Sequence, residues 1–283
     1  MGHGPRLDEV LGWRFAETPE RVCAVDHEGY VLTFRDLWHA SSSLAARLSQ
    51  YRDAVGPIAC GVGVLADTSF AGLVAYVACL QARVAYVSLD ILAPDALLDA
   101  QVSACLECVQ LCTLLCDASG KEPALRLSTA VQIPVLALDV CGQVDSAVSG
   151  THSSVAVPVP GRVVGRSPAA DVSALAHVIF TSGTSSGRPR AVLTDHTASI
   201  LSHAWRWPLG CSKGVPGPGR TSYSQGSSGD RDSFGDGTAN TVVGCGVFGF
   251  WDAMASLLAG DGSVAALLPR NVRPPPNESI VHT

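Results

Sequence analysis

The chain has 283 residues, of which 47% are hydrophobic and 16% are charged, so it can bury a substantial core and does not have the composition of a disordered protein. Its formal net charge is −6, from 25 acidic and 19 basic residues, and the basic residues do not gather into a stripe. This balance argues against nucleic acid and anionic membranes as partners.

The N-terminal part of the chain alternates between helical and extended patterns. Apolar residues at helical spacing predict a helix over residues 7–15, and the runs 22–25 and 30–32 predict a hairpin. Thr33 and Asp36 have the spacing of a capping box, which predicts the start of a second helix.

The alternation continues toward the middle of the chain. Residues 58–65 form an unbroken apolar run, as in strands that are buried on both faces. The later patterns predict helices over 70–81 and 94–104 and strands over 84–89, 109–115, 131–138 and 176–180. Strands that alternate with helices imply an α/β fold, a mainly parallel sheet covered by helices.

Two features bear on the cellular compartment. The first residues carry charges and no apolar segment of signal-peptide length, so we expect a cytoplasmic protein. Asp67, Gln81 and Arg83 interrupt the apolar stretch 58–89, which favours buried strands and a helix over a membrane span.

Ten cysteines are many for this length, and without a secretory signal we expect thiols rather than disulfides. The one cluster consists of Cys105, Cys108, Cys112 and Cys116. Its spacing matches no standard zinc or iron–sulfur pattern, and apolar residues fill the gaps. Because free cysteine packs as a small hydrophobe, we predict a core segment and no metal site.

The segment 177–196 has the composition of an anion cradle. A strand pattern leads into small hydroxyl residues and glycines, which let backbone N–H groups approach a phosphate closely. No Gly-Lys-Ser or Gly-Lys-Thr follows, so this is not a Walker A loop, and on composition alone a flexible turn is an alternative. The residues predicted to bind phosphate are Thr181, Ser182, Gly183, Thr184, Ser185, Ser186, Gly187 and Arg190.

The same segment resembles the phosphate loop of the adenylate-forming (AMP-binding) superfamily, whose motif reads Thr-Ser-Gly-Thr-Thr-Gly-x-Pro-Lys-Gly-Val. The match covers residues 181–184 and 187–192, with His196 following. Two differences stand beside it. The chain has two serines, 185 and 186, where the family has one residue, and Arg190-Ala191 where the family has Lys-Gly. Arginine keeps the charge but presents it as a planar fork.

Two earlier stretches are similar to further family motifs in the same order. Residues 32–37 resemble Leu-Thr-Tyr-x-Glu-Leu, and residues 79–90 resemble Leu-Lys-Ala-Gly-x-Ala-Tyr-Val-Pro-Leu-Asp. The likeness is strongest to amino-acid-activating and β-alanine-activating members, including adenylation domains of nonribosomal peptide synthetases. It implies an enzyme that uses ATP and Mg²⁺ to activate a carboxylic acid as acyl-AMP and passes it to the thiol of a carrier protein or of CoA.

The last part of the chain is less regular. A Gly/Ser/Pro-rich stretch is predicted to be disordered, and after it strands over 242–247 and 264–268 flank a helix over 250–258. We therefore expect a first α/β subdomain (1–207), an insertion (208–240) and the truncated start of a second subdomain (241–283).

The family's later motifs, which bind adenine, ribose and the carboxylate, do not follow in this sequence. The resemblance to an acid–thiol ligase therefore leaves two hypotheses open. In the first, the chain is an N-terminal fragment of such a ligase and is inactive as an isolated chain. In the second, it is a non-catalytic remnant that binds nucleotide or serves as an interaction module. An unrelated α/β protein is a third hypothesis. No catalytic residue is assigned, and we expect His177 and His196 to form hydrogen bonds rather than act in acid–base catalysis. An unfinished sheet also predicts poor solubility.

Overall fold

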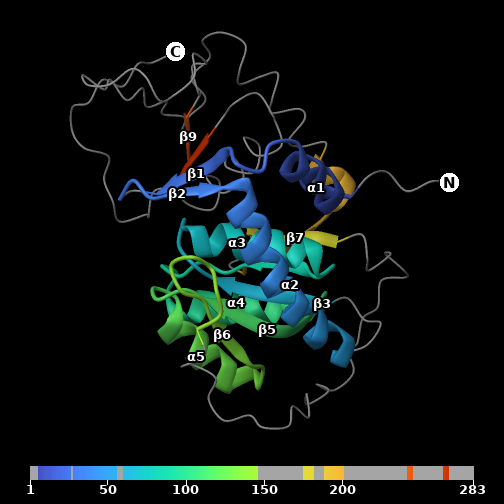
Figure 1. The fold of residues 1–283 in the computed structure, drawn as a ribbon. Coiled ribbons are helices and arrows are strands. Elements are labelled where there is room, and N and C mark those ends of the chain that lie inside the picture. The colour runs from blue at the N-terminus through green and yellow to red at the C-terminus, as the bar shows by residue number, and fades with distance from the viewer. Residues whose placement is uncertain are drawn as a thin grey trace, which may run out of the picture.

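The computed structural model describes residues 6–26, 28–55, 60–145, 175–181, 188–200, 241–244 and 264–267 (Figure 1). Its helices are α1 (Leu7–Glu17), α2 (Phe34–Val55), α3 (Phe70–Gln81), α4 (Asp95–Leu106) and α5 (Lys121–Val131). The strands of the first half are β1 (Val22–Asp26), β2 (Val31–Thr33), β3 (Cys60–Leu65), β4 (Ala85–Ser88), β5 (Gln110–Cys116) and β6 (Val135–Ala137). Those of the second half are β7 (Leu175–Thr181), β8 (Arg190–Asp195), β9 (Thr241–Gly244) and β10 (Val264–Leu267).

A six-stranded sheet with the order β6-β5-β3-β4-β7-β8 forms the centre of the fold. All neighbouring strands in it are parallel except β7 and β8, so the predicted α/β fold with a mainly parallel sheet is confirmed. Every residue of β3 is buried, as the unbroken apolar run predicted.

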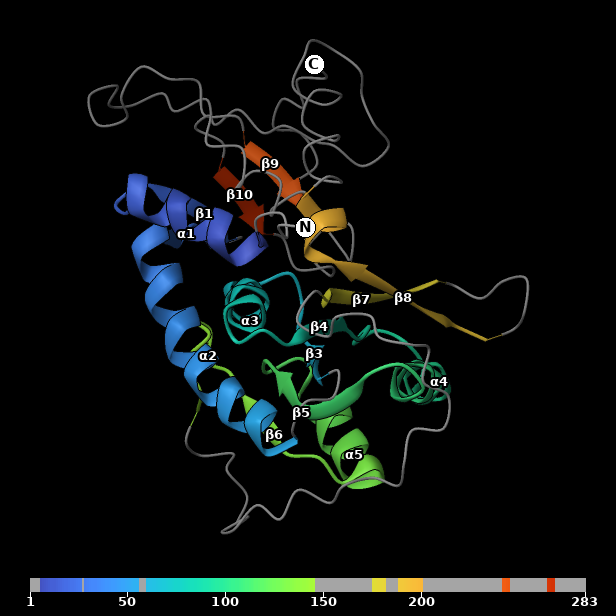
Figure 2. The same ribbon diagram turned by 90° about the vertical axis from the view of Figure 1, so that its right-hand side faces the viewer.

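Helices cover both faces of this sheet. Buried residues of α1, α2 and α3 pack in one core cluster, and those of α4 and α5 pack in another. Figure 2 shows α2 and α3 on one side of the sheet and α4 and α5 on the other. Within the described residues, no helix combines the length and the apolarity that a membrane crossing requires.

Local sequence explains where two of the helices begin. The capping box ahead of α2 is present, since Asp36 N–H donates to Thr33 Oγ1 at 3.1 Å and Thr33 N–H donates to Asp36 Oδ2 at 3.2 Å. At the start of α3, the Ser69 hydroxyl accepts the N–H of Gly72 at 3.2 Å. The bounds predicted for α3 are confirmed.

A second sheet has the order β2-β1-β10-β9. The predicted hairpin of β1 and β2 is antiparallel, and β1 also pairs in parallel with β10, where Ala24 lies opposite Ala265. Strands from the two ends of the sequence therefore share one sheet, a pairing that the sequence patterns did not reveal.

One segment was predicted wrongly. The run 131–138 was expected to be a single strand, but α5 extends to Val131 and β6 covers only Val135–Ala137. Gln132 ends α5 in the left-handed conformation (φ 55°), which breaks the apolar run in two. The predicted insertion at 208–240 and the predicted helix at 250–258 lie outside the described residues.

Candidate phosphate-binding site

The two ends of the predicted phosphate loop meet across an antiparallel hairpin. Thr181 is the last residue of β7, Arg190 is the first residue of β8, and the two lie directly opposite one another in the strand register. Both are exposed. The other six predicted residues lie outside the described residues: Ser182, Gly183, Thr184, Ser185, Ser186 and Gly187.

This hairpin projects beyond the rest of the sheet (Figure 2). Strand β7 pairs with β4 only at His177 and Val178, whereas its pairing with β8 continues to Thr181. The outer end of the hairpin, which carries Thr181 and Arg190, therefore extends past the carboxyl end of β4. A ligand can approach this end without displacing the buried core.

Arg190 differs in its charge environment from several other arginines that the structure describes. Arg6, Arg52 and Arg126 each lie within 3.0 Å of a carboxylate oxygen. Among the described residues, no carboxylate lies within ion-pair distance of Arg190. Its guanidinium, opposite the hydroxyl of Thr181, can donate several hydrogen bonds to a phosphate group.

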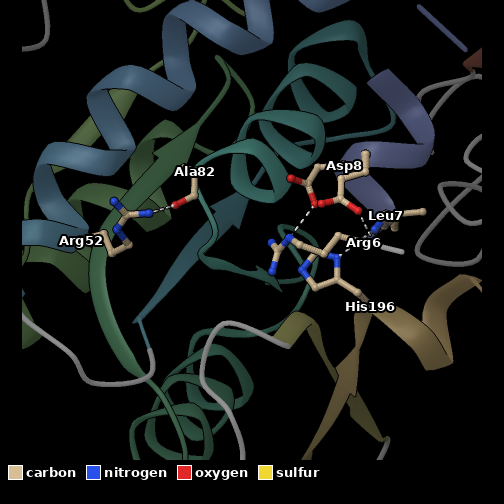
Figure 3. Close-up of polar contacts among 7 residues, drawn as sticks. Arg6, Leu7, Asp8, Arg52, Ala82 and His196 are labelled. Atoms are coloured by element: carbon tan, nitrogen blue, oxygen red, sulfur yellow. Dashed lines mark hydrogen bonds and ion pairs between the residues drawn. The ribbon is translucent and has the colours of Figure 1, made fainter. Parts of the chain in front are cut away.

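Two buried histidines anchor the base of the hairpin. His177 of β7 places Nδ1 3.2 Å from the hydroxyl oxygen of Ser199. His196 directly follows β8, and its Nδ1 accepts the N–H of Leu7 in α1 at 3.2 Å (Figure 3). Both histidines make the hydrogen bonds that the sequence predicted, and both are less than 5% exposed.

The environment of His196 favours its neutral form. Burial lowers the pKa of His196 to about 4, and the positive charge of Arg6 adds to this effect, while the carboxylates of Asp8, Asp195 and Glu9 oppose it. Arg6 is paired with Asp8 at 3.0 Å beside the imidazole (Figure 3). A neutral ring keeps Nδ1 available as the acceptor for Leu7.

Asp117, which lies at the carboxyl ends of β3 and β5, has a role that was not predicted from the sequence. Such ends are common ligand sites in parallel sheets where the connections diverge. Here the Asp117 carboxylate accepts the N–H groups of Asp67 at 2.9 Å and Gly120 at 3.0 Å. These two N–H groups therefore have their acceptor within the chain and are not available to bind an anion. An Asp directly after a buried strand and before Ser119-Gly120 was the available sequence signal.

Three of the four clustered cysteines pack in the core, as the sequence predicted for this segment. Cys105, Cys112 and Cys116 are buried, and Cys108 is exposed. Burial raises the pKa of Cys105 to about 12 and that of Cys116 to about 11, so both are thiols. In the described part of the chain, no three His, Cys, Asp or Glu side chains are placed to hold a metal ion.

Comparison with known proteins places this fold among adenylate-forming enzymes. The family model described as "AMP-binding enzyme" matches residues 11–223. The chain is 33% identical over 181 residues to the nonribosomal peptide synthetase asqK of Emericella nidulans, covering 64% of this chain and 6% of that protein. It is 31% identical over 203 residues to the cyclosporin synthetase simA of Tolypocladium inflatum, covering 69% of this chain and 1% of that protein.

Solved structures share the fold at low sequence identity. VinN in complex with 3-methylaspartate gives a TM-score of 0.60 at 16% identity, over 94% of this chain and 62% of that one. The ATP-bound chimera of RpMatB and BxBclM gives a TM-score of 0.56 at 18% identity, over 93% of this chain and 45% of that one. With the family match spanning most of the sequence, the chain belongs to the AMP-binding enzyme family.

Proposed function

We propose that this chain is the N-terminal part of an ATP-dependent ligase that activates a carboxylic acid, an amino acid or a related acid, as acyl-AMP for transfer to a thiol. The observation that carries the proposal is the pairing of Thr181 with Arg190 at the exposed end of the β7–β8 hairpin. Membership of the AMP-binding family supports ATP as the nucleotide.

In the proposed reaction the acid's carboxylate attacks the α-phosphate of ATP, and pyrophosphate leaves. The bond to the α-phosphate forms as the bond to pyrophosphate breaks, so negative charge grows on the departing β and γ phosphates. Arg190 would neutralise part of that charge and Thr181 would donate a hydrogen bond to it. Mg²⁺ bound to the phosphates would add further charge neutralisation. We propose that residues 182–187, the rest of the predicted phosphate loop, also bind these phosphates.

The relatives suggest the acceptor. One relative described above is named a nonribosomal peptide synthetase and the other a cyclosporin synthetase. We therefore propose the thiol of a carrier protein as the acceptor, with CoA as the alternative. We also propose a cytoplasmic location. We propose that the chain is divided into a first subdomain (1–207), an insertion (208–240) and the start of a second subdomain (241–283). The pairing of β1 with β10 means that the last segment contributes to a sheet begun near the N-terminus.

A second candidate is a non-catalytic remnant that binds nucleotide or another protein. The extra serine at 185–186 and the Arg190-Ala191 pair, which depart from the family motif, favour it. The chain also spans 45% and 62% of the two solved structures, so we propose that it lacks activity on its own.

Calorimetric titration of the 283-residue chain with MgATP tests the proposal, beside Arg190→Ala. Arg47→Ala is the matched control, since Arg47 is an exposed arginine on α2, away from the hairpin. Saturable binding that only Arg190→Ala weakens is the expected result. Absence of binding by a folded chain would contradict it. Acid-dependent exchange of labelled pyrophosphate into ATP by the isolated chain would contradict its proposed inactivity and rule out the non-catalytic remnant.

A further inference from the structure

Two cysteines lie three residues apart at the end of α4, closer in sequence than any other two cysteines of the chain. Cys105 is in the last turn of the helix, and Cys108 lies in the turn that leads to β5. The N–H of Cys108 donates to the carbonyl oxygen of Cys105 at 2.9 Å. In a turn closed in this way the first and fourth Cα atoms are less than about 7 Å apart, and a disulfide spans about 4.4–6.8 Å between its Cα atoms. The backbone therefore holds the two residues at a separation that suits a disulfide.

The two thiols differ in exposure. Cys108 is exposed, whereas Cys105 is fully buried. Burial raises the pKa of Cys105, and the negative charge of a Cys108 thiolate raises it further, as expected for thiols that lie near one another. An exposed thiol beside a buried one can undergo disulfide exchange in two steps, because the oxidant reaches the exposed thiol and the buried thiol then displaces it.

We propose that Cys105 and Cys108 form a reversible disulfide when the chain meets a small-molecule disulfide such as oxidised glutathione. This inference is independent of the proposed function. The Cys108 thiolate attacks one sulfur of the oxidant, whose S–S bond breaks and releases a glutathione thiolate. The Cys105 thiol then gives its proton to solvent and attacks the Cys108 sulfur, and the second glutathione thiolate leaves. Both released thiolates take up protons, so two protein thiols are oxidised to one disulfide and one glutathione disulfide is reduced to two thiols.

The bond would connect an exposed thiol to the core beneath α4. Cys105 belongs to the core cluster that contains Val178 of β7, and Ala191 of β8 packs against the same cluster. Figure 2 shows α4 on the side of the sheet away from α2 and α3. A disulfide between a buried sulfur and an exposed one lies at the boundary of this core. Oxidation therefore changes how the end of α4 packs against the sheet.

Peptide mapping of the 283-residue chain tests the inference. The chain would be incubated with glutathione disulfide, its remaining thiols alkylated in denaturant, and the product cleaved with a glutamate-specific protease. Cleavage after Glu107 separates Cys105 from Cys108, so a disulfide between them keeps the two peptides joined until dithiothreitol is added. We expect joined peptides. Because burial and the charge of Glu107 raise the pKa of Cys108, their initial rate of formation should rise about tenfold from pH 7 to pH 8, as the thiolate fraction does.

Three variants assign the bond, with thermal melts to show that each is folded. Cys108→Ser should abolish the joined peptides. Cys105→Ala should instead leave Cys108 as a stable mixed disulfide with glutathione, because the displacing thiol is gone. Cys141→Ser is the matched control, since it removes an exposed thiol elsewhere, and it should keep the joined peptides.

Cys141 in the wild type also reports that the oxidant has acted, because an exposed thiol forms a mixed disulfide with glutathione. Reduced Cys105 and Cys108 in a folded chain whose Cys141 carries glutathione would overturn the inference. Joined peptides that persist in Cys108→Ser would overturn it as well. So would a mixed disulfide at Cys108 that accumulates equally in the wild type and in Cys105→Ala.

Discussion

His196 Nδ1 lies 3.2 Å from the backbone nitrogen of Leu7, so a residue next to the end of β8 caps the first turn of α1 (Figure 3). The first N–H groups of a helix have no partner within the helix, and a buried one is costly if left unpaired. The imidazole supplies that partner. The same contact ties the N-terminal helix to the hairpin that carries Arg190.

The stability of the protein should depend on pH through His196. Its pKa is about 4 in the folded chain against an ordinary value of 6.5, so between these pH values the unfolded state binds more protons. The stabilisation is complete above pH 6.5 and is lost as the pH falls toward 4, by an amount on the order of 2 kcal/mol. Urea unfolding at several pH values measures this change.

His196→Asn is the control for this pH dependence. The Asn side-chain oxygen can accept the Leu7 N–H but does not titrate. The variant should therefore show a flatter fall in unfolding free energy between pH 6.5 and 4 than the wild type. Identical pH profiles for the two proteins would rule out His196 as the titrating group, whatever Asp8 and Glu9 contribute.

Gly120→Ala should destabilise the chain strongly. A Cβ atom at Gly120 would lie 1.9 Å from the carbonyl oxygen of Leu65, and backbone cannot move aside as a side chain can. We expect a loss of about 3 kcal/mol or more in unfolding free energy. Gly12→Ala is the matched control, because its Cβ would meet the Trp38 ring at an ordinary 3.5 Å. That change in mid-helix should stabilise by about 0.5–1 kcal/mol. Equal effects of the two variants in denaturant titrations would contradict the packing.

Asp117→Ala should separate the loops that follow β3 and β5. Besides the N–H groups of Asp67 and Gly120, the carboxylate accepts the N–H of Ser119 at 2.9 Å. Loss of these charge-assisted bonds should cost about 2–3 kcal/mol. Asp53→Ala, which removes only an exposed ion pair with Arg52, should change stability by less than about 1 kcal/mol. A melting temperature of Asp117→Ala equal to that of Asp53→Ala would show that the carboxylate does not join the loops.

Cysteine alkylation should distinguish two exposed thiols from six buried ones. Among the described residues, Cys108 and Cys141 are exposed. The buried thiols are Cys23, Cys60, Cys79, Cys105, Cys112 and Cys116. Among these eight described cysteines, mass spectrometry after brief iodoacetamide treatment should find label at the exposed pair alone, and all ten cysteines of the chain should be labelled after denaturation. Burial and the charge of Glu107 raise the pKa of Cys108, so its labelling should be slow at neutral pH and speed up as pH rises. Label at Cys79 in the native chain would contradict the core described above.

Local sequence determined where two of the helices that flank the six-stranded sheet begin. The capping box at Thr33 and Asp36 and the bounds of α3 could be predicted because they depend on residues within a few positions of one another. Helix α5 was not predicted, because its N-cap is Gly120, which has no side chain to accept a hydrogen bond from the first turn. Its last residue, Val131, also runs into the apolar stretch that ends in β6.

The phosphate-loop motif was readable from sequence, since family resemblance resides in consecutive residues. What only the tertiary structure decided is which groups meet: Thr181 with Arg190, His196 with Leu7, and β1 with β10. The first pairing depends on the strand register, and the other two join segments far apart in the chain. Such contacts depend on how the helices and sheets pack together. The hydrophobic effect is non-directional and stabilises any well-packed arrangement of apolar faces, so the fold as a whole determines which segments meet.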